Sequence, residues 1–274
     1  MTSSEPRQPT AYEQARLALA DPNATAEQLL NGALGLEGAF IRNEHLIGLL
    51  PGDAPEVMQA AYRAADAKGS RKAGLIWVRR AYFERAEPVA AAAARIDELT
   101  ANDPDGEAHL VRGWMRQQGY GFDQDLVASA ADLQVAAGLG NLDAVFELYI
   151  MAATGQGVAQ DADRALAYLE QAAQGGHRRA LYNLAANYAT GRGVAKDSAR
   201  ALQLYIQAAE KGNAQAAWTA ALMLLTGEAG VVDLEAAGVL LVEAEELGMD
   251  VEAGIDQLGA GLGKTALEAY EGQR

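Results

Sequence analysis

The sequence predicts an all-α protein built from stacked helix hairpins, and three observations support this prediction. Residue types recur at a fixed step of 36 residues through the second half of the chain. Apolar residues within each step follow the i, i+3, i+4 spacing of an amphipathic helix. Half of the 274 residues are hydrophobic but only 6% are aromatic. The many small Ala and Gly residues suit closely packed helices better than a β-sandwich, which favours β-branched and aromatic residues.

Five columns of residues keep the 36-residue step in one register. Two are glycine columns: Gly119, Gly155, Gly191 and Gly227, and then Gly140, Gly176, Gly212 and Gly248. Two are alanine columns: Ala108, Ala144, Ala180 and Ala216, and then Ala136, Ala172, Ala208 and Ala244. The fifth column is Asp125, Asp161, Asp197 and Asp233. The columns define complete units at 136–171, 172–207 and 208–243, with a weaker unit at 100–135.

Each unit encodes two helices, and residues 172–207 illustrate the pattern. Ala180 and Leu184 belong to an apolar stripe that runs to Gly191, which ends the first helix because glycine tolerates the left-handed conformation. Asp197 is expected to cap the second helix. A hairpin of this size buries too little apolar surface alone, so the units must stack on one another.

The segment from Ala180 to Asp197 reads A-x-x-N-L-A-x-x-Y-x-x-G-x-G-V-x-x-D and resembles the Sel-one-like repeat (SLR) family, which is related to the tetratricopeptide repeats. The resemblance is strong over 136–243 and weaker over 100–135. It implies a right-handed α-solenoid with a concave binding face, and an adaptor, scaffold or inhibitor role without catalysis. Bacterial members of the family include regulators and immunity proteins that neutralise secreted toxins.

The N-terminal third is expected to be helical after a short polar start. Residues 1–10 are predicted to be disordered, and 11–63 to form a helical region that begins with a helix at 11–20. Thr25 is expected to cap the following helix. Residues 64–99 resemble a degenerate repeat unit that has lost its Gly-x-Gly turn.

The repeat array is assigned to 100–251, and 252–274 is assigned to C-terminal capping helices. The segment Gly259–Thr265 looks like a phosphate-binding loop, but Leu258 stands where that motif requires glycine. Because Gly263 keeps the register of the first glycine column, we interpret the segment as a helix–helix turn. In the unit 208–243 the turn is expected to be altered, since Ala and Gly replace a Gly-Val step.

The net charge of −15 excludes a general nucleic-acid binder, which needs a basic surface. Nine acidic residues and no Lys or Arg lie between Gly212 and Gly263. This stretch is either a solvated cap or a docking surface for a partner with a basic surface. A small basic cluster either pairs with acidic neighbours or contacts an acidic partner; it consists of Arg71, Lys72, Arg79, Arg80 and Arg85.

No constellation in the sequence predicts catalysis, a metal site or a cofactor. Cys is absent, the three histidines are far apart, and no G-x-S-x-G motif occurs. No run approaches the roughly 18–20 apolar residues of a membrane span, and the start lacks a secretory signal, so we expect a cytoplasmic protein without membrane insertion. Whether the chain forms homo-oligomers is left open.

Candidate partner-binding residues occupy two columns in the first helix of each unit. The first column is bulky throughout: Leu110, Phe146, Tyr182 and Trp218. The second column is Met115, Met151, Asn187 and Met223. These side chains either pack between stacked helices or line a concave groove, where aromatic and Met side chains anchor a partner. Glu147 and Asn183 would then supply polar specificity.

The resulting candidate site is Phe146, Glu147, Met151, Tyr182, Asn183, Asn187, Trp218 and Met223. The leading hypothesis is a protein-interaction module or adaptor that binds a partner protein or peptide and is not an enzyme. The alternative is an immunity protein that neutralises a cognate bacterial toxin. An enzyme with an unrecognised site in the N-terminal third is a less favoured third hypothesis.

Overall fold

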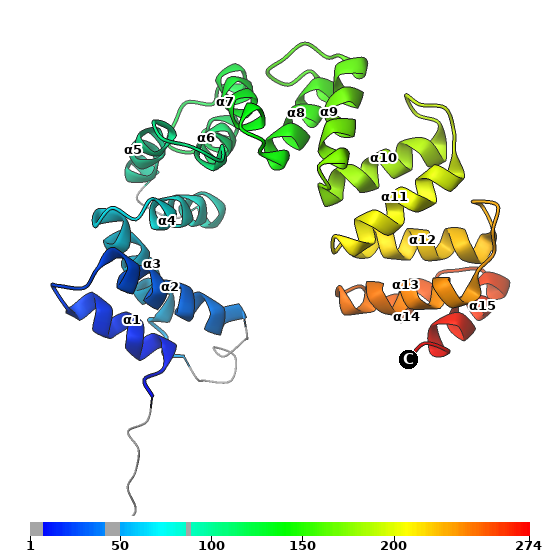
Figure 1. The fold of residues 1–274 in the computed structure, drawn as a ribbon, viewed down its shortest axis with the longest axis horizontal. Coiled ribbons are helices and arrows are strands. Elements are labelled where there is room, and N and C mark those ends of the chain that lie inside the picture. The colour runs from blue at the N-terminus through cyan, green and yellow to red at the C-terminus, as the bar shows by residue number, and fades with distance from the viewer. Residues whose placement is uncertain (1–7, 42–49, 86–88) are drawn as a thin grey trace, which may run out of the picture. The chain divides into compact units, whose positions relative to one another are not determined.

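The protein is all-helical wherever its structure, a computed structural model, describes it: residues 8–41, 50–85 and 89–274 (Figure 1). These ranges contain fifteen α-helices and no strand, which confirms the predicted fold class. Of the segment 1–10 that was predicted to be disordered, residues 1–7 lie outside the described ranges. The chain divides into two compact units, unit 1 (Met1–Asp125) and unit 2 (Leu126–Arg274).

Unit 1 consists, in its described part, of six helices that each pack on the next. They are α1 (Ala11–Ala20), α2 (Ala26–Ile41), α3 (Ala54–Ala67), α4 (Arg71–Glu84), α5 (Val89–Thr100) and α6 (Glu107–Gln118). The first has the predicted bounds, and Thr10 caps it by accepting from the backbone N–H of Glu13. Thr25 accepts from the backbone N–H of Gln28 at 3.2 Å, which confirms the second predicted cap.

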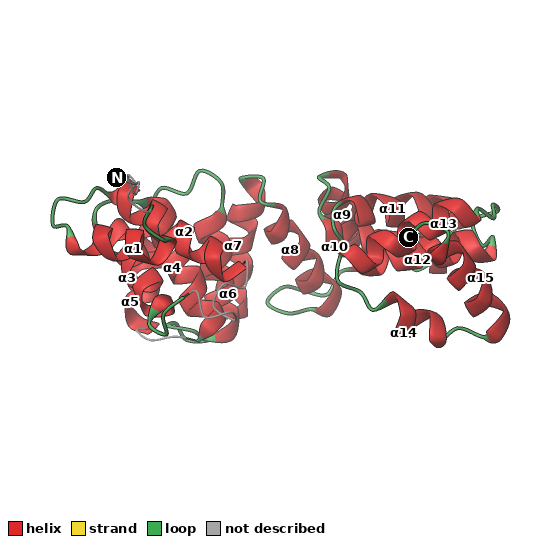
Figure 2. Ribbon diagram, turned by 90° about the horizontal axis from the view of Figure 1, so that it is seen from below, coloured by secondary structure: helices red, strands yellow, loops and turns green. Residues whose placement is uncertain are grey.

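Unit 2 consists of helix pairs followed by a shorter terminal arrangement. The pairs are α8 (Leu142–Thr154) with α9 (Ala162–Gln174), α10 (Arg178–Thr190) with α11 (Ser198–Glu210), and α12 (Ala214–Thr226) with α13 (Leu234–Glu246). Helix α7 (Leu126–Gly138) precedes them, and α14 (Val251–Asp256) and α15 (Ala260–Glu271) follow. Figure 2 shows α10 and α12 in one layer and α9, α11 and α13 in the other. Each helix packs on its successor from α7 to α13, as in an α-solenoid.

The repeated residues have distinct structural roles. The alanine columns of unit 2 are fully buried between helices, where a larger side chain would push the helices apart. Gly155, Gly191 and Gly227 end α8, α10 and α12 with φ between 71° and 78°, a conformation that favours glycine. The carboxylates of the aspartate column accept from backbone N–H groups at the starts of α9, α11 and α13, as predicted.

A further capping column was not predicted from the sequence. Asn141, His177 and Asn213 cap the first helices α8, α10 and α12, each accepting from a backbone N–H three residues on, at 3.1–3.2 Å. The turn after α12 is altered, as expected, because its second positive-φ glycine is Gly230, one residue later than in the preceding unit.

The interpretation of Gly259–Thr265 as a helix–helix turn is wrong. Gly259 is the N-cap of α15, and Gly263 lies buried inside that helix. The reason is that α14 has only six residues, so the following helix begins before the repeat register would place the turn. A Cβ on Gly263 would lie 3.2 Å from the carbonyl oxygen of Ile255, so this glycine allows α15 to approach α14 closely.

Candidate functional site

The first helices of the three pairs in unit 2 expose the same side, which we call the repeat face. It comprises Asp143, Glu147, Ile150 and Thr154 on α8; Arg179, Asn183, Ala186 and Thr190 on α10; and Gln215, Thr219, Leu222 and Thr226 on α12. Its members lie at i, i+4, i+7 and i+11, which puts them on one side of a helix. In all three helices the two end positions are exposed and the two middle positions are half-buried.

The repeat face combines an apolar line with polar neighbours. Ile150, Ala186 and Leu222 are half-buried and pack against the core beneath them. The hydroxyls of the threonines at the ends of the three helices, Thr154, Thr190 and Thr226, donate to the backbone carbonyls of these same residues at 2.7–2.8 Å. The hydroxyl protons are therefore used within the helix, and their oxygens remain as acceptors. An apolar centre with a polar rim is the usual composition of a protein–protein interface.

Three of the eight predicted site residues lie on or beside the repeat face. Glu147 and Asn183 occupy its half-buried polar column. Tyr182 is half-buried next to it, and its ring meets that of Tyr205 edge-on, with centroids 5.3 Å apart. Burial raises the pKa of the Tyr205 hydroxyl to about 12, with smaller contributions from Tyr182 and Glu228.

The structure places the other five predicted residues in the core: Phe146, Met151, Asn187, Trp218 and Met223. The Phe146 ring stacks on His177 at a centroid distance of 4.7 Å, and the Arg179 guanidinium lies over it. The Trp218 ring packs on α14, since a Cβ on Gly254 would come within 2.7 Å of it. Any contact of these buried side chains with a partner stays a prediction.

The sequence did contain a signal for the repeat face. Thr154, Thr190 and Thr226 recur at the 36-residue step and immediately precede the glycine that ends each helix. We expected the bulky side chains to anchor the partner. In a stack of helices, however, a column of bulky side chains usually faces the core. The exposed side is marked by the column that varies in charge: Asp143, Arg179 and Gln215.

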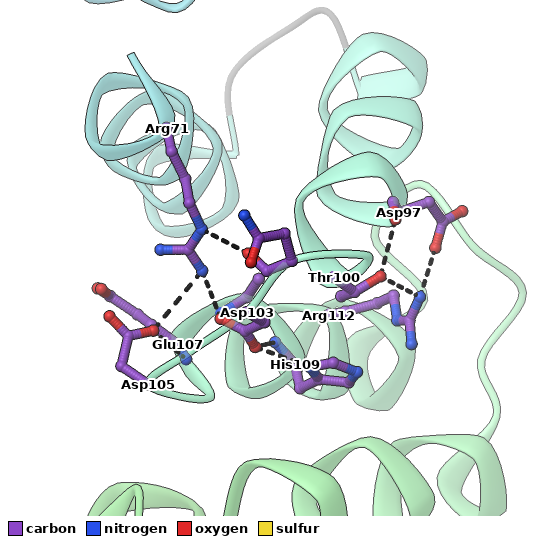
Figure 3. A network of polar contacts seen from close by, with 10 residues as sticks. Arg71, Asp97, Thr100, Asp103, Asp105, Glu107, His109 and Arg112 are labelled. Atoms are coloured by element: carbon purple, nitrogen blue, oxygen red, sulfur yellow. Dashed lines mark hydrogen bonds and ion pairs between the residues drawn. The ribbon is translucent and has the colours of Figure 1, made fainter. Parts of the chain in front are cut away.

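Unit 1 contains a polar network centred on the buried Asp103 (Figure 3). Its carboxylate accepts from the backbone N–H groups of Ala108 and His109, at 3.1 and 2.9 Å, near the start of α6. The His109 ring Nδ1 lies 2.7 Å from it, and the Arg71 guanidinium of α4 forms an ion pair with it. The network joins α4 to the start of α6 and was not identified from the sequence.

The pKa of Asp103 is lowered. Burial alone would raise it, but the hydrogen bonds from His109 and Ala108 and the positive charge of Arg71 outweigh burial. Nearby, Arg112 of α6 binds Asp97 at 3.0 Å and the Thr100 hydroxyl at 2.8 Å, so α5 and α6 are also tied together (Figure 3). These groups bridge helices, and their arrangement indicates a structural role.

The basic cluster predicted from the sequence is largely paired within unit 1. Arg71 pairs with Asp103, Arg79 lies 3.2 Å from Glu107, and Arg80 contacts Glu37 at 3.0 Å. Of the two alternatives for this cluster, pairing with acidic neighbours therefore holds for these three arginines.

The acidic stretch near the C-terminus is used in part for structure. The carboxylates of Asp233 and Asp250 cap α13 and α14, and Arg274 contacts both Glu245 and Glu252. Burial and the neighbouring Glu210 and Glu246 raise the pKa of the Glu243 carboxyl. The remaining exposed carboxylates still fit either a solvated cap or a docking surface.

The described ranges contain neither a candidate metal site nor a candidate membrane-spanning helix. No group of three His, Asp or Glu side chains there is arranged to hold a metal ion. Among the same residues, no helix combines the length and apolar character needed to cross a membrane.

Comparison with known proteins supports the resemblance noted in the sequence. The Sel1 repeat family model matches residues 146–177 and 178–213. No curated protein matches the sequence. Among solved structures, a Sel1 repeat protein from Oxalobacter formigenes has a TM-score of 0.63 and 24% identity, covering 88% of this chain and 97% of that one.

Two further structures share the fold. The protein c5321, described as a protective antigen of uropathogenic Escherichia coli strains with an SLR fold, has a TM-score of 0.58 and 22% identity over 95% of this chain and 60% of c5321. The immunity protein PA5088 from Pseudomonas aeruginosa has a TM-score of 0.57 and 18% identity, covering 89% of this chain and 90% of that one. Residues 146–213 therefore match two consecutive Sel1 repeats, and the chain shares the fold of solved Sel1-repeat structures.

Proposed function

We propose that this chain is a protein-interaction module that binds a partner protein or peptide through the repeat face of unit 2 and performs no catalysis itself. Sel1-repeat proteins are generally protein-interaction modules, and their fold is typically a non-catalytic scaffold.

The main support is that the first helices of three consecutive repeats keep the same exposure pattern while their side chains differ. Asp143, Arg179 and Gln215 share one position but carry negative, positive and neutral side chains. In every repeat the middle of the face has one half-buried polar and one half-buried apolar position. Varied polar groups beside a constant apolar line are what recognition of one partner requires.

A substitution in the middle of the repeat face tests the proposal. We expect Asn183→Arg to weaken binding of the natural partner about tenfold or more, because a long charged side chain covers the apolar line and is desolvated on binding. The partner is first identified by affinity purification with the unmodified chain. Its dissociation constant is then measured by calorimetry for each variant.

Gln207→Arg is the matched control, because Gln207 is exposed on α11, in the other helix of the same repeat. It adds the same charge to the chain and should change the dissociation constant less than about twofold. Equal losses in the two variants, or no loss in either with the fold intact, would contradict the repeat face as the binding surface.

A second candidate function is that of an immunity protein, and the likeness to PA5088 supports it. In that case the partner is a toxin of the same bacterium, and the repeat face covers the toxin's active site. Co-expression should then restore growth of cells that make the toxin, and Asn183→Arg should abolish the rescue. Rescue that is unaffected by this substitution would contradict an immunity function of the repeat face.

A further inference from the structure

Unit 2 contains a pocket of about 590 Å³ between consecutive repeats. Its apolar wall is formed by Ala153 of α8, Ala165 and Leu166 of α9, and the Tyr149 ring. Its polar side is formed by Asn187 of α10 and by Arg192 in the turn that follows this helix. A cavity of this size with an apolar wall and a few converging polar groups is the usual form of a ligand site.

The preceding repeat shows why a pocket opens here. There the turn glycine Gly157 packs against the start of the previous helix, and a Cβ on it would lie 2.1 Å from the Leu126 carbonyl oxygen. The Met151 methyl group fills the space below, 2.8 Å from the same point. One repeat later, a Cβ on the equivalent Gly193 would meet no atom within 4 Å.

Three changes between the two repeats coincide at this point. Counting 36 residues on, Met151 becomes Asn187, Leu126 becomes Ala162, and Gln156 becomes Arg192. The first removes the side chain that fills the space below the turn, the second shortens the side chain of a residue whose backbone meets the turn, and the third adds a cation. All three later residues line the pocket. In the later repeat, an open pocket next to a positive charge therefore replaces the packed contact of the earlier repeat.

The polar groups of the pocket have unused donors. Asn187 is only 7% exposed, and its Oδ1 accepts from Arg192 Nε at 3.3 Å. Its Nδ2 has no acceptor among the residues that the structure describes, and the terminal nitrogens of Arg192 have none there either. The donors that remain on Asn187 and Arg192 suit a ligand that supplies acceptor oxygens.

The repeat that supplies Asn187 and Arg192 to the pocket is rich in cations. Residues 171–209 contain the five cations Arg178, Arg179, Arg192, Lys196 and Arg200 but a single carboxylate, Asp197, in a chain of net charge −15. No ion pair in the described ranges involves these cations: Arg192 donates to Asn187, Arg200 donates to Gln203, and Arg179 lies over the Phe146 ring. Asp197 already accepts from a backbone N–H of α11. The carboxylates of the same residues therefore do not neutralise the positive charge of this repeat.

We propose that this pocket binds an Asp or Glu side chain of the partner polypeptide, with its carboxylate on Asn187 Nδ2 and the Arg192 guanidinium and an adjacent apolar residue against Ala165 and Leu166. An Arg fork and an amide donor together match the two oxygens of a carboxylate. Because Asn187 lies one helical turn beyond Asn183, the pocket adjoins the repeat face. That the carboxylate comes from a polypeptide rests on the proposed function.

A peptide titration tests the pocket directly. The probe is acetyl-Gly-Leu-Glu-Leu-Gly-amide, which has the side-chain carboxylate as its only charge, and the matched probe has Gln in place of Glu. We expect the Glu peptide to shift the NMR signals of the Asn187 side-chain amide and of Arg192 Nε–H at millimolar concentration. The Gln peptide should bind about tenfold more weakly, because it lacks the charge-assisted hydrogen bonds.

Variants taken from the neighbouring repeats locate the binding. Asn187→Met and Arg192→Gln introduce the residues that the preceding repeat carries at these positions, so the fold should tolerate them. Each substitution should weaken binding of the Glu peptide about fivefold or more. Arg178→Gln removes the same charge at the other end of α10 and should change the affinity less than about twofold. Melting temperatures confirm that the variants fold.

Several outcomes would overturn the proposal. They are equal affinity for the Glu and Gln peptides, an equal loss in Arg178→Gln and Arg192→Gln, or no shift up to about 10 mM peptide. Binding of glutarate, or of the Gln peptide with a free C-terminus, in the absence of Glu-peptide binding would assign the site to another carboxylate source. The peptide titration does not probe the repeat face. If it fails, the test of the repeat face with Asn183→Arg therefore still stands.

Discussion

At the scale of single residues, Asp103 shows how one buried carboxylate can hold two helices of unit 1 together. It accepts from two backbone N–H groups at the start of α6 and pairs with Arg71 of α4. Each of these contacts favours the charged form, which explains why its pKa is lowered in spite of burial. The residue therefore couples the stability of unit 1 to pH.

We expect Asp103→Asn to lower the free energy of unfolding at pH 7 by about 2–4 kcal/mol, because it leaves Arg71 without its buried partner. Since the pKa of Asp103 is lowered on folding, its contribution is present above the ordinary Asp pKa of about 3.9 and is lost as pH falls through the lower folded value. In urea titrations, the difference in free energy of unfolding between wild type and variant should shrink as pH falls through that range. Asp105→Asn, at an exposed position, is the control. A difference that does not depend on pH would contradict this role.

At the scale of the elements, two glycines in the same column should differ in their tolerance to substitution. Gly157 and Gly193 have nearly the same φ, 71° and 73°. Gly193→Ala meets open space and should cost only backbone strain, about 1–2 kcal/mol. Gly157→Ala also drives a methyl group into the Leu126 carbonyl and should cost about 3–4 kcal/mol. Thermal or urea unfolding of the two variants checks this; equal losses would contradict the packing described for the two turns.

Local signals in the sequence were sufficient to predict many of the elements. The helix at 11–20 and the aspartate caps follow from contacts within a few residues, so the sequence reveals them. The start of α15 depends on the packing of α14, and the pairing of Asp103 with Arg71 joins segments 32 residues apart. The candidate site was predicted only in part, because the rotation of α8, α10 and α12 decides whether Phe146 or Glu147 faces outward.

At the scale of the whole molecule, the two compact units differ in where their charges are used. Arginines of unit 1 pair with nearby carboxylates, whereas the cations of residues 171–209 do not. The acidic stretch beyond Gly212 has several exposed carboxylates with no lysine or arginine among them. A partner that docks there needs a basic surface, and one that fills the pocket needs an acidic side chain.

If the acidic stretch attracts a basic surface, association should depend on salt. We expect the association rate constant of the partner to fall as ionic strength rises from about 0.05 to 0.5 M, because the Debye length shortens. Glu235→Gln with Asp256→Asn should weaken this dependence and leave the dissociation rate nearly unchanged. Stopped-flow or surface-binding kinetics measure both rates. A salt dependence that is the same in the double variant would assign the stretch to a solvated cap.

The central claim is that the partner lies on the repeat face, and site-specific cross-linking tests it most directly. The chain has no Cys, so Thr190→Cys creates a single thiol on the exposed end of that face, and Gln207→Cys creates one on α11. With a short thiol-directed photo-cross-linker, we predict that the partner becomes attached at position 190 and not at position 207. Attachment at 207 alone, or equally at both positions, would contradict the account.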